Sequence, residues 1–150
     1  MFQPHPEAGV ELAPGYRLRS QVLDVNINRF GLRGPEIDAV PPAGTKRIAL
    51  LGGSAAFGYF VSDDATAASH LERGLRERGH AVEVLNAAVP SYDLRRVIIR
   101  YRERVQPLEP DVVELAQADH RAAVRGVGHR REHVTAGPDQ VVGEQAEERP

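Results

Sequence analysis

Short apolar runs stand out in the middle of the chain, and each is bordered by turn-forming or charged residues. They lie at 47–52, 81–85 and 111–115 and predict three strands, the first of them buried. Because amphipathic stretches separate the runs, we expect right-handed strand–helix–strand crossovers and a parallel sheet. The pattern therefore predicts an α/β fold with helices on both sides of the sheet, which makes three layers.

Two stretches between these runs have helical periodicity. The first, about 64–78, has leucines four residues apart and follows Asp63 and Asp64, either of which can cap a helix. The second, about 92–105, carries its apolar residues along one stripe, and we expect the prolines after it to end it (Pro107 and Pro110).

The two ends of the chain differ from this middle part. Residues 1–46 are rich in Pro and Gly and predict an irregular lead with one short strand or hairpin, because apolar residues alternate at 23–27. The partial α/β domain covers 47–115. Residues 116–150 contain no Leu, Ile, Phe, Tyr or Met, so we expect a poorly ordered or weakly helical tail and a truncated fold.

Composition narrows the function classes. Hydrophobic residues make up 41%, charged residues 27%, and the formal net charge is −2, which argues against general binding to nucleic acid or to a membrane surface. The chain has no cysteine, so disulfides and thiolate metal sites are excluded. The first residues lack the basic and apolar regions of a secretory signal, and a cytoplasmic location is expected.

A glycine turn after the first apolar run is the main candidate for chemistry. Gly52 and Gly53 end the run and Ser54 follows, at the edge of the predicted sheet where ligands bind in open α/β folds. The segment is not a phosphate-binding loop, because the lysine of that motif is missing, and it is not a dinucleotide fingerprint, because the second glycine is missing. It nearly matches the nucleophile elbow Gly-x-Ser-x-Gly, with Ala56 in place of the last glycine. A structural alternative is that the glycines only allow the turn and that Ser54 caps the next segment.

Several segments in the right order resemble the SGNH (GDSL-type) hydrolase family. Residues 28–34, Asn-Arg-Phe-Gly-Leu-Arg-Gly, are similar to its N-x-x-G-x-R-G segment, and 46–54 end in Gly-Gly-Ser where Gly-Asp-Ser is commoner. Residues 86–92, Asn-Ala-Ala-Val-Pro-Ser-Tyr, are similar to N-x-G-V-P-G-Y, and 110–115 to the strand before the third block. The resemblance implies a flavodoxin-like parallel sheet and an ester hydrolase acting on acyl or carbohydrate esters.

The same resemblance implies the roles of individual residues. Ser54 is the expected nucleophile, and the N–H groups of Ser54 and Ala88 are the expected oxyanion donors. His120 stands where the family has an asparagine donor, and with Asp119 beside it is also a candidate base. The family's Asp-x-x-His does not occur after Ser54, so we expect weak or absent activity. The alternative is a non-catalytic module that binds an anion or another small ligand.

Other polar clusters carry less chemistry. His129 and His133 have helical metal-ligand spacing but no third ligand, so no metal and no cofactor are expected. Five arginines of the second predicted helix spread around it, which indicates a solvated face instead of a nucleic-acid site (Arg95, Arg96, Arg100, Arg102 and Arg104). The expected partners are a small ester substrate and a second copy of the chain, through an exposed sheet edge.

Overall fold

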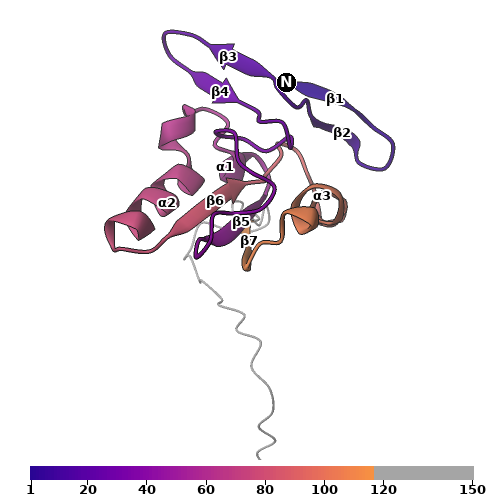
Figure 1. The fold of residues 1–150 in the computed structure, drawn as a ribbon. Coiled ribbons are helices and arrows are strands. Elements are labelled where there is room, and N and C mark those ends of the chain that lie inside the picture. The colour runs from indigo at the N-terminus through magenta and orange to yellow at the C-terminus, as the bar shows by residue number, and fades with distance from the viewer. Residues whose placement is uncertain (117–150) are drawn as a thin grey trace, which may run out of the picture. The chain divides into compact units, whose positions relative to one another are not determined.

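Three parallel strands form the centre of the fold, in the order β6-β5-β7 (Figure 1). The computed structural model describes residues 1–116, which belong to one compact unit. The strands are β5 (Lys46–Gly52), β6 (Val82–Asn86) and β7 (Val112–Ala116). Each lies within a residue of its predicted position, so the α/β architecture with a parallel sheet is confirmed.

Strand β5 is the central strand, and its apolar run explains why. It pairs with β6 from Lys46↔Val82 and with β7 from Ile48↔Val112. Ala49, Leu50 and Leu51 are buried, as expected for a parallel strand covered on both faces. In contrast, Val112, Val113 and Leu115 of β7 are 43–50% exposed, and in the described part of the chain β7 is an edge strand.

Helices α2 (Ala67–Glu77) and α3 (Leu94–Arg100) lie on opposite sides of the sheet (Figure 1). This arrangement follows from right-handed crossovers that run from β5 to β6 in one direction and from β6 back past β5 to β7 in the other. Two short helical segments follow β5: α1 (Ser54–Phe57) and a 3₁₀ turn, η1 (Asp63–Ala65).

The helix boundaries differ from the prediction. Thr66, and not Asp63 or Asp64, caps α2, because its hydroxyl accepts the N–H of Ser69. The second helix is capped by Asp93 and does not stop near residue 105: after α3 come a π-helical turn, η2 (Tyr101–Val105), and a 3₁₀ turn, η3 (Gln106–Leu108), that includes Pro107. Proline is tolerated there because it occupies the first turn of a new helical segment.

The N-terminal lead is more regular than expected, with two hairpins in place of one short strand or hairpin. Their strands are β1 (Phe2–His5) with β2 (Gly9–Leu12), and β3 (Arg17–Arg19) with β4 (Asp24–Asn26). Apolar residues from this lead are fully buried in the core shared with the sheet (Leu12, Ile27 and Leu32). The lead therefore packs as part of the same core.

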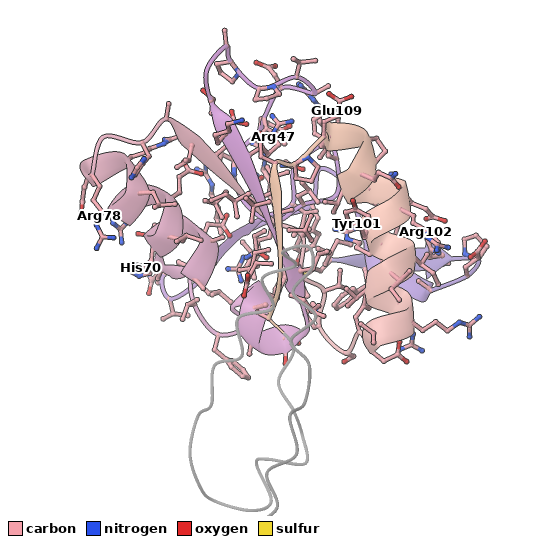
Figure 2. All side chains as sticks on the ribbon, turned by 90° about the horizontal axis from the view of Figure 1, so that it is seen from below. Arg47, His70, Arg78, Tyr101, Arg102 and Glu109 are labelled. Carbon is pink, nitrogen blue, oxygen red and sulfur yellow. The ribbon has the colours of Figure 1, made fainter. Side chains whose placement is uncertain are left out.

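Buried arginines fasten these layers through main-chain oxygens. The Arg47 side chain is fully buried on β5 (Figure 2) and donates to the carbonyls of Asp38, Ala39 and Leu108 at 2.8–2.9 Å. It also pairs with Glu83 at 2.7 Å, so its charge is compensated within the protein.

No helix among residues 1–116 is long and apolar enough to cross a membrane.

Candidate active site

The carboxyl ends of β5 and β7 meet at the glycine turn. Gly52 pairs with Ala116 and has φ +150°, a conformation that residues with a side chain rarely adopt. A Cβ on Gly52 would overlap the Ala116 carbonyl oxygen and lie 2.9 Å from Ala56 Cβ. Gly53 is different: its backbone is extended, and a Cβ there would meet only the Tyr92 carbonyl oxygen, at 3.8 Å.

Ser54 is the first residue of α1 and is exposed to solvent. Its carbonyl accepts the N–H groups of Gly58 and Tyr59, at 3.0 and 3.3 Å. Its hydroxyl makes no hydrogen bond with any part of residues 1–116, and Gly53 occupies the N-cap position. Ser54 therefore does not cap the helix, and its hydroxyl and the first amide of α1 are both available to a ligand.

An open cavity of about 500 Å³ lies beside Ser54. Its lining consists of a short continuous stretch of chain around α1 (Ser54, Ala55, Gly58, Tyr59, Phe60 and Val61). Tyr59 and Phe60 form an edge-to-face ring pair with centroids 5.0 Å apart, and Phe60 is 89% exposed. The exposed serine thus stands at a mainly apolar hollow.

Residues 86–92 run beside the glycine turn but do not present the expected oxyanion donor freely. Ala87 and Val89 donate to the carbonyls of Leu50 and Gly52, at 2.9 and 3.0 Å. Ala88 is fully buried, and its N–H donates to the Asn86 Oδ1 atom at 3.3 Å. Its φ is not positive, so alanine causes no backbone strain there; Ser91, with φ 65°, adopts the left-handed conformation instead.

Arg33 fixes the segment that follows Ser54. Its side chain is fully buried and donates to Asp63 Oδ1 at 2.8 Å and to the Phe57 carbonyl at 2.8 Å. It also donates to the carbonyls of Gly58 and Val61, and its guanidinium lies over the Phe57 ring, 4.6 Å from the centroid. The loop between α1 and α2 is therefore anchored at both ends by one side chain.

No described histidine is a base for Ser54. His5 bonds Glu103 at 2.6 Å in the first hairpin, and His70 bonds Arg73 on the outer face of α2, away from the sheet (Figure 2). His80 is exposed after α2. His120, the candidate donor or base, and the pair His129 and His133 lie outside the described residues. Among residues 1–116 no group of acids and histidines is arranged to hold a metal ion.

Arg100 contradicts the prediction of a fully solvated arginine face. It is 3% exposed and donates to the carbonyls of Ala87 and Gly31. Burial lowers the pKa of its guanidinium to about 10, because the charged form loses its water. Its Nη1 atom is buried without a partner in the described structure. Arg100 thus joins two segments of the site region, one from the N-terminal lead and one from the second crossover.

Two positioning residues were not singled out from the sequence, Arg33 and Asn86. Besides accepting from Ala88, Asn86 donates through Nδ2 to the carbonyl of Phe57 at 3.2 Å, at the end of α1. Both lie inside segments that the sequence analysis had compared with known motifs, residues 28–34 and 86–92, so a signal for them was present. Comparisons with models of known protein families and with curated proteins give no match to this chain.

Proposed function

We propose that this protein is an SGNH-type serine ester hydrolase in which Ser54 is the nucleophile. The observation that carries the proposal is the position of Ser54 at the carboxyl end of the central strand and beside an apolar cavity. Its hydroxyl is exposed and makes no hydrogen bond with residues 1–116. The strand order β6-β5-β7 also agrees with the first three strands of a flavodoxin-like sheet, in the order 2-1-3.

In the proposed reaction the Ser54 oxygen bonds to the ester carbonyl carbon, the bond to the alkoxy oxygen breaks, and the alcohol leaves. Water then attacks the acyl-serine, releases the carboxylic acid and restores the hydroxyl. The N–H of Ser54 stabilises the oxyanion. The N–H of Ala88 becomes a second donor only if it gives up its bond to Asn86.

Removal of the serine proton is the demanding step, because no base among residues 1–116 is bonded to Ser54. The proposal assigns this role to His120. Ala116 pairs with Gly52, and His120 follows it by four residues, which span at most about 14 Å. Because the family's Asp-x-x-His does not occur after Ser54, we expect a rate several orders of magnitude below that of a complete triad.

The decisive test compares hydrolysis of p-nitrophenyl acetate by the wild type, Ser54→Ala and His120→Ala, with His129→Ala as the matched control. We expect Ser54→Ala to lower kcat/KM at least about tenfold, His120→Ala to do the same, and His129→Ala to change it less than twofold. Equal rates for the wild type and Ser54→Ala would overturn the proposal.

The alternative, a non-catalytic binding module, is favoured by the lack of a described base. The glycine turn could hold an anion through main-chain N–H groups. Helix α1 has only four residues, so its dipole adds little to such a site. Stabilisation of the fold by phosphate or sulfate, without any ester hydrolysis, would support this alternative.

A further inference from the structure

We infer that the cavity beside Ser54 binds the alkyl chain of the acyl group, and that the preferred ester therefore carries a chain longer than acetyl. This inference rests on the proposed role of Ser54 and adds the substrate class. It follows from the lining of the cavity, from the exposure of Phe60 and from the way in which Arg33 holds the loop.

The lining of the cavity fits an alkyl chain. Among residues 1–116 the lining has no charged side chain, and the side-chain hydroxyls it presents are those of Ser54 and Tyr59. A sugar ring would need several hydrogen-bonding groups around its hydroxyls, and an anion would need a positive charge or a set of convergent N–H groups. The apolar surface of Tyr59, Phe60 and Val61 supplies neither, but it can cover methylene groups.

The exposure of Phe60 indicates that this apolar surface binds a ligand. At 89% exposed it is among the most exposed apolar side chains of residues 1–116, and it stands next to two further exposed apolar residues, Tyr59 at 43% and Val61 at 37%. Contiguous exposed apolar groups mark binding sites more often than scattered ones do. The hydroxyl of Ser54 borders the same hollow, so an ester whose carbonyl reaches Ser54 would place its chain there.

The loop that carries Phe60 is held in place before any ligand arrives. Arg33 binds the carbonyls of Gly58 and Val61, which lie on either side of Tyr59 and Phe60. The Tyr59 ring also lies between those of Phe57 and Phe60, with a centroid distance of 6.4 Å to the buried Phe57. A surface fixed in this way loses little conformational entropy on binding, so most of the free energy of the apolar contact favours esters with longer acyl chains.

The experiment measures kcat/KM for p-nitrophenyl acetate, butyrate and hexanoate. A fully buried methylene is worth about fourfold, and the open cavity buries about half of that surface, so we expect about twofold per methylene. The four added methylenes then raise kcat/KM for hexanoate about 16-fold over acetate in the wild type. Phe60→Ala reduces this ratio to below about fourfold, whereas Phe60→Leu, which keeps an apolar side chain, retains most of it.

Val22→Ala is the matched control, because Val22 is also 89% exposed but lies between the strands β3 and β4. It leaves the hexanoate-to-acetate ratio at the wild-type value. Binding is measured independently of catalysis with Ser54→Ala, as the shift of the backbone amide signals of Ala55 and Gly58–Val61 when sodium octanoate is added. The shifts are expected in this stretch and are weaker in the double variant with Phe60→Ala.

The outcomes separate the two proposals. If octanoate shifts the amide signals of Ala55 and Gly58–Val61 but the wild type hydrolyses none of the esters, the binding site is supported and the catalytic role of Ser54 is rejected. Hydrolysis that depends on Ser54, with a flat chain-length profile and no shifts, rejects the binding site alone. A concentration-dependent dimer that Phe60→Ala dissociates, together with a flat profile, also rejects it, because a second copy of the chain would then be the occupant.

Discussion

Replacing each glycine of the turn by alanine tests the geometry that holds Ser54. At Gly52 two costs add: φ of +150° is a conformation in which a non-glycine residue costs about 1–3 kcal/mol, and the new Cβ would overlap the Ala116 carbonyl oxygen. Relief of that overlap moves the end of β7 away from β5 and weakens at least one hydrogen bond, which adds about 1 kcal/mol. We therefore expect Gly52→Ala to lower the free energy of unfolding by about 3 kcal/mol.

Gly53→Ala is the matched control one residue along the chain. Its backbone is extended, and the new Cβ would meet only the Tyr92 carbonyl oxygen, at an ordinary contact distance of 3.8 Å. Restriction of the unfolded chain then favours alanine by about 0.4–1 kcal/mol, but alanine is a poorer N-cap than glycine by a similar amount. The expected net change in the free energy of unfolding is within about 0.5 kcal/mol of zero.

The assay is urea denaturation followed by far-UV circular dichroism, since the chain has no tryptophan to report on folding. The same variants give a thermal check: Gly52→Ala should lower Tm by about 10–15 °C, and Gly53→Ala by no more than about 2 °C. If Gly53→Ala cost as much as Gly52→Ala, the close contact between the ends of β5 and β7 would be wrong. The placement of Ser54 would then lose its support.

Two further predictions concern buried ion pairs. Arg33→Lys keeps the charge but cannot reach all four acceptors of the guanidinium, so it should lower the free energy of unfolding by about 3 kcal/mol in urea titrations. Arg29→Lys, at an exposed ion pair in the same segment, should lower it by less than about 0.5 kcal/mol. Equal losses for the two variants would refute the role of Arg33 in holding the loop. Burial would raise the pKa of Glu11, but hydrogen bonds from Gln3 and Arg104 and the Arg104 charge hold it below its usual 4.5. The stabilisation by Glu11 is thus present above about pH 4.5 and is lost as the pH falls through the lowered pKa of the folded state. Glu11→Gln should therefore lower Tm at pH 7 and make Tm less sensitive to acid below pH 4.5. An unchanged acid sensitivity of Tm in this variant would contradict the prediction.

Strand β5 could be predicted from the sequence because burial on both faces demands a continuous apolar run. The run Ile48–Leu51 is typical of a central strand in a parallel sheet, and the glycines after it mark the end of the strand. The position of Ser54 at the carboxyl end of β5 follows from the same pattern. The start of α2 could not be found in this way, because Asp63 is used by distant partners, the Arg33 side chain and the N–H of Asn26, and leaves capping to Thr66.

The candidate site shows the same division between local and distant causes. Arginines are normally placed at the surface, so nothing in the local pattern marks Arg33, Arg47 and Arg100 as buried. Each is buried because main-chain carbonyls from remote segments converge on it. The engagement of the Ala88 N–H by Asn86 likewise depends on a side-chain orientation that spacing does not reveal. The candidate base falls outside the described residues, so the structure leaves that prediction open.

Arg33 has a consequence for any attempt to divide the protein at residues 41–44, Pro-Pro-Ala-Gly, where the lead meets the first strand of the sheet. A polypeptide that began at Lys46 would keep every strand of the parallel sheet, and by sequence alone it would pass for a self-sufficient folding unit. It would nevertheless lose the guanidinium that binds the carbonyls of Phe57, Gly58 and Val61. It would also lose the buried apolar side chains of Leu12, Ile27 and Leu32 from the shared core. The N-terminal lead thus supports the loop that follows Ser54, and a working fragment must contain both.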